Sequence, residues 1–418
     1  MLTDPQLAII RTTIPALQQH GEAITTYFYA RLFVEHPELL NIFNKANQRP
    51  GGQAAKLAAS ILMYAAHIDH LDKLDGMIER IAHKHCSMYI QSEHYPIVGR
   101  HLLQAIRHVL GESATDDVID AWAAAYSQLA GIMSGREEQL YVAGAQKEGG
   151  WRGYKPFRVE EKVVESSTIV SLYLVPDDGA PLPTFSPGQY LSMKLRTSND
   201  PHEQIRQYSI SCAPNGRYYR ITVGRERVCD NSVDAPDGIV SSFLHDDVKE
   251  GDVLLVHMPL GGFILDECSS RPVVLISGGV GITPMLSMFE HLTNSEGRQV
   301  TFMHGTWNRS QHAFRKQIRE TASTWPNVKA VILYNEVDDD DIQGEHHDEQ
   351  GVIKASTLAR HLPTLDADFY LCGSPRFLKA IEDVLDSLSV PKHRRNVESF
   401  APDPSFLTEI DEVDETAA

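Results

Sequence analysis

His85 is the residue in the first third of this chain whose type and position could serve metal chemistry. It falls at helical spacing with Ile78 and Ile81, so its ring belongs to an apolar stripe, whereas His83 lies on a more polar side. An inward histidine between helices can be a core residue with hydrogen-bonded ring nitrogens, because buried polar groups need only a partner. The alternative is an axial ligand of haem iron. The stripe alone leaves both interpretations open.

Two further polar residues could share a cavity with such a ligand. Gln53 heads an apolar stripe that runs on through Leu57, and Tyr29 lies among aromatic residues of an earlier helical pattern. A tyrosine and a glutamine that point into one apolar cavity can donate hydrogen bonds to an oxygen-derived ligand on a metal. Otherwise, Tyr29 is a core aromatic with its hydroxyl at the surface, and Gln53 is a residue at a helix start.

A tetrapeptide near the middle of the chain, Arg206-Gln207-Tyr208-Ser209, is similar to the R-x-Y-S pattern of the ferredoxin–NADP reductase superfamily. On one strand, an arginine can pair with a flavin pyrophosphate, and a tyrosine two residues on shares its face and can lie against the isoalloxazine. The serine can hydrogen-bond the flavin near N5, where a hydride arrives. Tyr190 resembles a second flavin contact.

Two glycine-containing segments could bind pyrophosphates at helix N-termini. Gly238, Val240 and Ser241 precede an apolar helix pattern in the flavin-like part. In the last part, an apolar strand runs into glycines that would let the backbone approach a pyrophosphate, in the superfamily's G-x-G-x-x-P variant: Gly278-Gly279-Val280-Gly281-Ile282-Thr283-Pro284. Simple turn chemistry is the alternative for all these glycines.

Two later strand ends could also touch a nucleotide. Cys372-Gly373 follows a strand of the last part, and ligands bind at that edge of an open α/β sheet. By the same resemblance it lies near the nicotinamide, although no base is apparent for Cys372 and we expect a packing thiol. Arg309 and Ser310 follow the second strand of this part and could contact a 2′-phosphate, or could be an ordinary helix start.

The elements that must position these residues change in type at Gly149-Gly150-Trp151. Before it, helical patterns predict a first helix that ends at Gly21 and further helices at about 22–35, 53–68, 75–90, 95–110 and 115–147. After it, short strands between Pro and Gly turns give way to alternating strands and helices. We expect a multidomain chain with an all-α globin-sized domain, an antiparallel β-barrel and an α/β domain with a parallel sheet. The expected bounds are 1–148, 151–264 and 270–403, with an acidic, mobile tail at 404–418.

The composition excludes several classes of protein. The 418 residues carry a formal net charge of -18, which argues against nucleic acid, because a phosphate-binding surface needs a basic stripe. No apolar run approaches the roughly 20 residues of a membrane span, and the N-terminus shows no signal-peptide pattern. Five cysteines without C-x-x-C spacing are typical of reduced thiols in a cytosolic protein. We expect the acidic run 338–349 to be solvated surface and not a calcium site.

The helical part resembles the globin domain of the flavohaemoglobin family. The matching residues fall in the family's order and spacing: Tyr29, Phe43, Gln53, Leu57, Lys84-His85, Tyr95 and Glu137. Three stretches also match: Asn47-Gln48-Arg49, Tyr95-Pro96-Ile97-Val98-Gly99 and Asp120-Ala121-Trp122. The resemblance implies that His85 is the proximal ligand of a haem b, next to Lys84. It makes Tyr29 and Gln53 the distal donors, and it packs Phe43 and Leu57 on the haem.

The resemblance also places Tyr95 and Glu137 behind His85 as a proximal network. A carboxylate that accepts the second ring N–H gives the imidazole imidazolate character and orients it. The ligand then pushes electron density onto iron, which suits oxygen activation better than reversible storage. Without the resemblance, Glu137 between Arg136 and Glu138 is an ordinary solvated charge.

The resemblance reaches to about residue 403. Glu398 and Phe400 match a glutamate and an aromatic residue that, in the family, lie near the flavin ring and the haem edge. The chain departs from the family at Ala401, where a glycine is usual, and at Gly224, where a lysine is usual. The seam at 149–151 is then expected to be the joint that holds a haem edge near a flavin edge.

The activity that this resemblance implies is nitric oxide dioxygenation. NAD(P)H passes a hydride to FAD, FAD passes single electrons to haem, and bound oxygen reacts with nitric oxide to give nitrate. Flavin is needed between the two, because nicotinamide gives electron pairs and iron takes them singly. We expect a cytoplasmic monomer whose partners are oxygen and nitric oxide, with a haem pocket that could also take a lipid. The alternatives are a haem-based gas sensor and an NAD(P)H-dependent flavin reductase acting on ferric chelates, quinones or peroxides.

Overall fold

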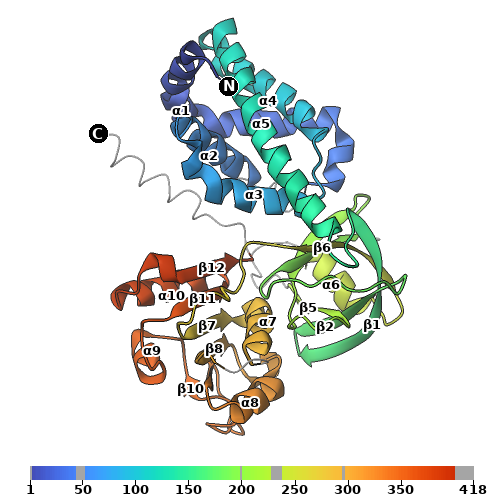
Figure 1. Ribbon diagram of the computed structural model, residues 1–418, viewed down its shortest axis with the longest axis vertical. Coiled ribbons are helices and arrows are strands. Elements are labelled where there is room, and N and C mark those ends of the chain that lie inside the picture. Colours follow the sequence, from blue (N-terminus) through green and yellow to red (C-terminus); the bar gives the residue numbers. More distant parts are fainter. Residues whose placement is uncertain (1, 44–51, 198–199, 227–237, 294–296, 401–418) are drawn as a thin grey trace. The chain divides into compact units, whose positions relative to one another are not determined.

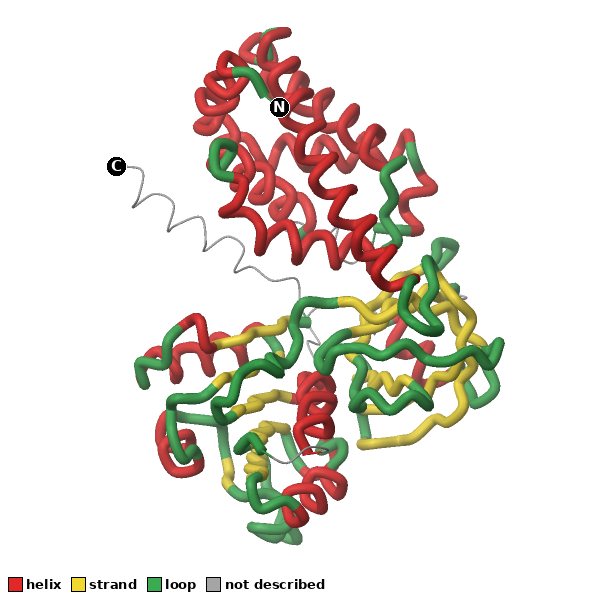
Figure 2. Tube along the Cα trace, viewed as in Figure 1, coloured by secondary structure: helices red, strands yellow, loops and turns green. Residues whose placement is uncertain are grey.

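The computed structural model describes residues 2–43, 52–197, 200–226, 238–293 and 297–400. They form two compact units, of which the first ends at Ala145 and also takes in Asp200–Ile205, and the second begins at Gln146. Up to Ala145 the described residues form helices and no strand, and the strands follow from Tyr154 onward (Figure 1; Figure 2). The predicted acidic tail, the stretch 47–49 and the family departure at residue 401 lie outside the described residues.

The helices of the first unit pack around one apolar core. In the described residues they are α1 (Asp4–Glu35), η1 (Pro37–Asn41), α2 (Gln53–Ala66), η3 (Leu71–Leu74), α3 (Asp75–Ser87), α4 (His94–Leu110), η4 (Gly111–Ser113) and α5 (Asp116–Ala145). Phe28 and Leu32 of α1, Tyr64 of α2 and Trp122 of α5 meet in this core, each almost fully buried. Within the described ranges, every helix is too short or too polar to cross a lipid bilayer.

The first helix corrects one expectation. Gly21 was predicted to end it, but α1 runs unbroken from Asp4 to Glu35. A Cβ built on Gly21 would lie 3.3 Å from the Cβ of Ala58 on α2, and the hydroxyl of Thr25 donates to the carbonyl of Ala54 at 2.8 Å. The glycine therefore serves the close approach of two helices, which outweighs its low helix propensity.

The second unit begins with an antiparallel sheet. Its elements are β1 (Tyr154–Ser166), β2 (Ile169–Pro176), β3 (Tyr190–Leu195), β4 (Gln204–Ser209), β5 (Tyr219–Gly224), α6 (Ile239–Asp246) and β6 (Val253–Leu260). The strand order is β4-β3-β6-β1-β2-β5, with β1 antiparallel to both β2 and β6. Fully buried side chains such as Phe157, Leu172 and Val256 fill its core. The predicted antiparallel sheet is confirmed.

A parallel sheet with helices on both faces completes this unit. Its elements are β7 (Val273–Gly278), η5 (Gly279–Gly281), α7 (Ile282–Thr293), β8 (Val300–Thr306), η6 (Arg309–Gln311), α8 (Arg315–Thr324), β9 (Val328–Tyr334), β10 (Glu349–Gln350), α9 (Ala355–His361), β11 (Asp368–Gly373), α10 (Pro375–Ser387), η7 (Lys392–Arg394) and β12 (Arg395–Ser399). Its strand order is β10-β9-β8-β7-β11-β12, and all its pairings are parallel in the described residues.

The central strand β7 shows why both faces need cover. Val273 and Leu275 belong to one core with residues of α7 and α8, whereas Val274 and Ile276 belong to another with residues of α9 and α10. Successive strand residues point to opposite faces, so a continuous apolar run must be buried on both. Figure 1 shows the two helix pairs on opposite sides of the sheet. The predicted α/β architecture is confirmed.

The order of strands fixes where this sheet can bind a ligand. The chain passes from β7 to β8 on one side, and β11 later joins β7 on the other. In such open sheets, ligands bind outside the carboxyl ends of the strands where the order reverses. The glycine-rich turn after β7 lies at this switch point.

Candidate functional site

Three side chains of the first unit form a short hydrogen-bonded network around His85. Nδ1 of His85 on α3 lies 2.7 Å from Oε1 of Glu137 on α5, and 3.2 Å from the hydroxyl of Tyr95 on α4. The Tyr95 hydroxyl also donates to the same Glu137 oxygen at 2.5 Å. A carboxylate only accepts, so the ring proton on this side belongs on Nδ1 and the lone pair falls on Nε2. His85 is thus prepared to ligate a metal through Nε2.

Glu137 is a buried residue and not a solvated surface charge. Its exposed fraction is 2%, although Arg136 and Glu138 flank it in the sequence. Burial and the Glu137 carboxylate both raise the pKa of Tyr95, so this phenol remains a neutral donor. The structure therefore excludes the interpretation of Glu137 as an ordinary solvated charge.

The surroundings hold this network in place. The Tyr126 hydroxyl donates to the carbonyl of Tyr95 at 2.7 Å, and a Cβ on Gly99 would lie 2.4 Å from the Tyr126 ring. Arg136 binds the Glu79 carboxylate through two nitrogens at 2.6 and 2.7 Å, which ties α5 to α3. A bidentate arginine–carboxylate pair fixes orientation as well as distance. The exposed Lys84 precedes His85 outside this set.

The predicted distal residues also come together in the first unit. The rings of Tyr29 and Phe43 are 6.0 Å apart, and both pack against the helical core with Leu57. Burial raises the pKa of Tyr29, and hydrogen bonding with the Gln53 side chain opposes that rise. Oε1 of Gln53 is buried without a hydrogen-bond partner among the described residues. A buried polar atom without a partner is uncommon, and here it fits a site that a ligand completes.

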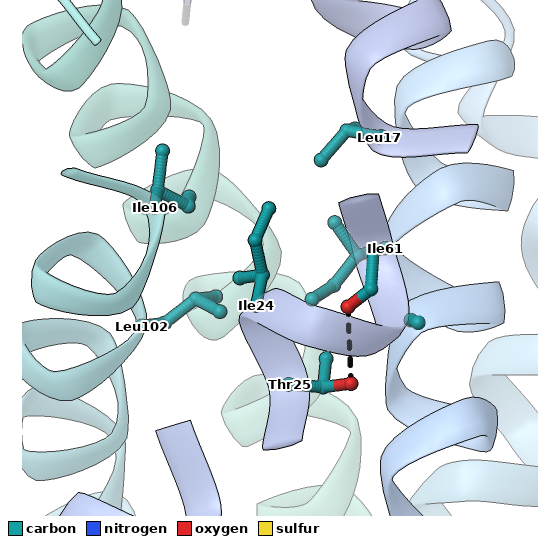
Figure 3. Close-up of a pocket in the computed structure, with 8 residues that line it drawn as sticks. Leu17, Ile24, Thr25, Ile61, Leu102 and Ile106 are labelled. Carbon is teal, nitrogen blue, oxygen red and sulfur yellow. Dashed lines mark hydrogen bonds between the residues drawn. The ribbon is translucent and has the colours of Figure 1, made fainter. Parts of the chain in front are cut away.

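A small cavity in the same unit is not large enough for a cofactor. It lies between α1, α2 and α4 and has a volume of about 10 Å³, which is room for at most one water (Figure 3). Its lining is mostly aliphatic, from Leu17, Ile24, Ile61, Leu102 and Ile106, and the Thr25 hydroxyl there already donates to the carbonyl of Ala54. The cavity therefore belongs to helix packing.

In the antiparallel sheet, the predicted flavin contacts lie on β4 and at the start of β3. Ser209 is buried, whereas Arg206, Gln207 and Tyr208 are half-buried, and Tyr208 packs against the core of the sheet. Burial raises the pKa of Tyr208, and the nearby Arg206 charge opposes that rise. Ile210 directly follows β4, and its backbone N–H donates to the carbonyl of Gln189 at 2.9 Å. Gln189 directly precedes Tyr190. These strand ends are therefore neighbours.

A glycine makes room for Tyr190. Gly261 has φ of +115°, and a Cβ on it would lie 2.9 Å from the Tyr190 ring. This close approach explains a glycine in the segment that follows β6. The Tyr190 ring therefore packs against the backbone at Gly261, and Tyr190 lies next to the end of β4.

The first side chains of α6 contact neighbouring parts of the protein. Val240 is buried in the sheet core, and the Ser241 hydroxyl donates to the carbonyl of Gly238 at 3.0 Å and accepts from the backbone N–H of Glu226 at 3.2 Å. The Ser241 hydroxyl is therefore already engaged, and an anion at this end of α6 would meet backbone N–H groups. That is the donor type a helix N-terminus offers to a pyrophosphate.

The turn after β7 is built for close approach of peptide groups. A Cβ on Gly281 would lie 2.3 Å from the carbonyl oxygen of Cys372, and one on Gly278 would lie 2.8 Å from the Phe377 ring. Gly279 has φ of +54°, and a Cβ there would meet nothing within 4 Å. One glycine of the turn therefore faces open space, while its neighbours pack tightly against β11 and α10. This arrangement fits a nucleotide pyrophosphate.

The first residues of α7, directly after this turn, are buried. Ile282 and Thr283 are almost fully buried, and the Thr283 hydroxyl donates to the carbonyl of Val280 at 3.1 Å. Gly224, where the family has a lysine, lies beside this turn, since a Cβ on it would be 3.2 Å from Val280. The antiparallel and parallel sheets thus meet near the predicted nucleotide site.

Three parallel strands bring their ends level at this edge. Cys372 lies opposite Ser277 of β7 and opposite Glu398 of β12 in the strand registers. Burial, reinforced by Glu398, raises the pKa of the Cys372 thiol well above its ordinary value, which suits packing and not nucleophilic attack. Gly373 packs against α10, and Phe400 is 45% exposed after β12.

Comparisons with known proteins identify the family of this chain. A model of the globin family matches residues 26–133, and a model of the oxidoreductase NAD-binding domain matches residues 275–383. A flavohemoprotein of Deinococcus radiodurans is 51% identical over 98% of this chain and 100% of its own length. The chain belongs to the flavohemoprotein family. A flavohemoprotein of Rhizobium meliloti is 44% identical over 96% of this chain and 99% of its own length.

Two solved structures resemble this flavohemoprotein. A flavohemoglobin of Malassezia yamatoensis, solved with bound FAD and haem, has a TM-score of 0.82 and 26% identity, and covers 96% of this chain and 100% of its own. The FAD/NAD-binding domain of a Vibrio cholerae nitric oxide dioxygenase has a TM-score of 0.52 and 35% identity, and covers 59% of this chain and 99% of its own. The family resemblance seen in the sequence is confirmed.

Sequence reasoning missed several residues of this flavohemoprotein that support its sites. An inward stripe of α5 joins Met133, Glu137 and Tyr141 at i, i+4 and i+8, all almost fully buried, and this period could have flagged Glu137. An isolated glycine within a helical pattern often marks a close contact, so Gly99 could have pointed to the Tyr126 ring. The ion pairs of Arg309 with Asp340 and of Arg220 with Glu290 join residues far apart in the sequence, so no local pattern predicts them.

Proposed function

We propose that this flavohemoprotein is a nitric oxide dioxygenase, which uses NAD(P)H to convert nitric oxide and oxygen to nitrate. The observation that carries the proposal is the buried network of His85, Glu137 and Tyr95, in one chain with a glycine turn at the switch point of a parallel sheet. The name of the Vibrio cholerae relative supports it. Two nitric oxides, two oxygens and one NAD(P)H would give two nitrates, NAD(P)⁺ and one proton.

The cofactors of this reaction are haem b, FAD and NAD(P)H. When bound, they supply a hydride, its division into single electrons and an iron that takes up oxygen. The chain's own residues would bind these groups, orient them and keep water away. The described residues fit this set at His85, at the unpartnered Gln53 oxygen and at the open face of Gly279.

On the proximal side, His85 would hold the iron through Nε2. Glu137 accepts the Nδ1 proton and so increases the donor strength of the ring, while Tyr95 keeps the carboxylate in one orientation. Lys84 would border the same site. A strongly donating ligand favours oxygen chemistry over reversible oxygen storage.

On the distal side, Tyr29 and Gln53 would hold oxygen by hydrogen bonds. The hydroxyl of Tyr29 stays protonated because burial raises its pKa, so it can donate at any physiological pH. The Gln53 amide carries both a donor and an acceptor and can turn either toward a ligand. Phe43 and Leu57, which pack with Tyr29, would lie on the haem and exclude water.

In the antiparallel sheet, the strand ends of β4 and β3 would bind FAD. Arg206 would pair with the pyrophosphate and Gln207 would border it, together with backbone N–H groups at Gly238, Val240 and Ser241. The rings of Tyr208 and Tyr190 would lie against the isoalloxazine, and Ser209 would hydrogen-bond near N5.

In the parallel sheet, the turn after β7 would bind the nicotinamide nucleotide. Its contacts would come from Gly278, Gly279, Val280, Gly281, Ile282 and Thr283. Cys372 and Gly373, at the end of β11, would border the nicotinamide. Glu398 and Phe400 would lie near the flavin ring.

The same proposal sets the organisation of the chain. The globin domain would span 1–148, the FAD domain 151–264 and the NAD(P) domain 270–403, with a tail at 404–418. We propose a cytoplasmic monomer whose small-molecule partners are oxygen and nitric oxide, and whose haem pocket could admit a lipid. Neither a nucleic acid nor a membrane span is part of this function.

Replacing His85 tests the proposal, with a neighbouring histidine as the matched control. His85→Ala should lose haem and nitrate formation and leave a yellow protein that still oxidises NADH. His83→Ala should keep both, because the His83 ring pairs with Glu79, which Arg136 still binds through two nitrogens. Haem retained at normal occupancy in His85→Ala would refute the ligand assignment. A wild-type protein that consumes NADH with nitric oxide and oxygen but forms no nitrate would be a flavin reductase, and one that binds the gases without turnover would be a sensor.

A further inference from the structure

The loops after β8 and β9 lie side by side at the ligand-binding edge of the parallel sheet. β8 and β9 are paired from Val300–Val328 to Thr306–Tyr334, so their carboxyl ends are level. Arg309 follows β8, and the acidic run that starts at residue 338 follows β9. In nucleotide-binding sheets, the position after the second strand reads the adenosine ribose: an acidic residue binds a 2′-hydroxyl, and an arginine accommodates a 2′-phosphate.

Arg309 is already committed to the acidic run. Its Nη2 donates to the Asp340 carboxylate, and its Nε lies 3.1 Å from Oδ1 of Asp341. Its Nη1 donates to the Asp340 carbonyl at 3.4 Å and lies 3.4 Å from Nδ1 of His346. Each guanidinium nitrogen thus faces an acceptor of the same loop. The charge that could attract a phosphate is already neutralised.

Asp341 corrects the expectation of a fully solvated loop. Its side chain is 0% exposed, its Oδ2 accepts from the backbone N–H of Asp338 at 2.9 Å, and its Oδ1 is buried without an aligned hydrogen bond among the described residues. Arg309 is therefore the charge that compensates a buried carboxylate. Removing the partner of a buried charge is costly, so Arg309 is held in this loop.

We propose that Asp340 and Asp341, by holding Arg309, make this protein select NADH over NADPH. The inference rests on the nicotinamide site of the proposed function. To bind Arg309, a 2′-phosphate would have to displace the buried Asp341 carboxylate. The phosphate would then lie beside the negative charges of both Asp340 and Asp341. A 2′-hydroxyl has no such conflict and can donate to the Asp340 carboxylate, which is 71% exposed. Arg309, which the sequence left open as a 2′-phosphate contact, is thus engaged by carboxylates of the chain itself.

Arg319 of α8 does not replace Arg309. Arg319 lies 3.0 Å from Oδ2 of Asp348 and donates to its Oδ1 at 3.1 Å. Asp338, Asp339 and Glu345 are exposed in the same loop, and Glu345 lies 3.6 Å from the buried His346. These carboxylates add negative charge beside Arg309, which disfavours a dianion.

Nucleotide fragments provide a test that does not depend on catalysis. Isothermal titration of the full-length, FAD-loaded protein with 5′-AMP and with 2′,5′-ADP should show weaker binding of 2′,5′-ADP by roughly tenfold. Asp340→Asn should narrow that difference by improving 2′,5′-ADP binding, because it removes one of the two carboxylates that hold Arg309. Glu320→Gln is the matched control, because it removes one exposed carboxylate of α8, which lies 3.7 Å from Lys316. It should leave the ratio within about twofold.

Flavin reduction provides the second readout. Anaerobic stopped-flow mixing should show that NADH reduces the flavin with a higher second-order rate constant than NADPH, and Asp340→Asn should raise the NADPH value about tenfold with NADH little changed. The gain should shrink at high salt, because Asp340 is exposed. Equal use of both nucleotides by the wild type, or an unchanged ratio in Asp340→Asn, would overturn the proposal. Neither readout involves nitric oxide, so either can fail or succeed independently of the dioxygenase assignment.

Discussion

Glu290→Gln should destabilise the second unit by breaking a buried ion pair. Arg220 of β5 is 5% exposed, and its Nη2 lies 2.7 Å from Oε1 of Glu290 on α7. Oε2 of Glu290 accepts from the backbone N–H of Ala213 at 2.8 Å, and the Arg220 guanidinium lies 4.9 Å from the centre of the Phe314 ring. The substitution keeps the shape but leaves one acceptor oxygen where Glu290 uses two. It therefore removes the charge that compensates Arg220 and turns an amide NH₂ toward either the Ala213 N–H or the Arg220 guanidinium.

The size of the effect follows from burial. Removing one partner of a buried pair costs about 3–5 kcal/mol. The Glu290 side chain keeps 21% exposure, so water relieves part of the penalty and the lower value of about 3 kcal/mol applies. Melting temperatures of domains near this size fall by about 2–4 °C per kcal/mol, which gives a drop of about 6–12 °C.

Differential scanning calorimetry of the FAD-loaded protein measures this drop, with FAD fluorescence used to assign the transition of the second unit. The exposed pair of Glu320 and Lys316 supplies the comparison, since Glu320→Gln should change stability by less than about 0.5 kcal/mol. A shift in Glu290→Gln below about 2 °C, or no larger than that of Glu320→Gln, would refute the reasoning. It would mean that Arg220 finds enough solvent or backbone acceptors without its partner.

Three further predictions concern the haem site, the nucleotide turn and acid stability. Glu137→Gln should lower the iron–histidine stretching frequency in resonance Raman spectra and slow nitrate formation about tenfold or more, and an unchanged frequency would contradict the network. Gly281→Ala should abolish NADH-dependent flavin reduction, since its Cβ would meet the Cys372 carbonyl at 2.3 Å; a wild-type rate would contradict the packing. Burial lowers the pKa of His257 and of His304 from 6.5 to about 4, so the unfolded state binds more protons. Each neutral histidine contributes up to about 3 kcal/mol to the free energy of unfolding, fully above pH 6.5 and less as the pH falls toward 4. His257→Gln should therefore weaken the pH dependence of the free energy of unfolding, measured by urea denaturation, between pH 6.5 and 4. An unchanged pH dependence would contradict this prediction.

The sequence supported the elements and most of the site because both depend on local patterns. The apolar run of β7 and the glycines after it predicted a strand, a tight turn and a helix, and the structure has all three. His85 and Gln53 were predicted as site residues from the stripes that they share with apolar residues. Gly21 misled because its low helix propensity was overruled by a contact with Ala58, far along the chain.

Other features depend on residues that are distant in the sequence. Glu137 appears solvated among charged neighbours, and only its contacts with α3 and α4 show why it is buried. Asp341 lies in a run of carboxylates, and nothing local distinguishes it from Asp339 until Arg309 is placed beside it. Long-range ion pairs carry no periodic signal, so a single sequence does not reveal them.

The most direct test of the central claim is the yield of nitrate for each NADH consumed. The haem- and FAD-loaded protein is mixed with excess NADH, oxygen and nitric oxide, and nitrate and NADH are quantified over many turnovers. Each nitric oxide that becomes nitrate takes one electron and each NADH supplies two, so we expect two nitrates per NADH. NADH oxidation with little or no nitrate would contradict it.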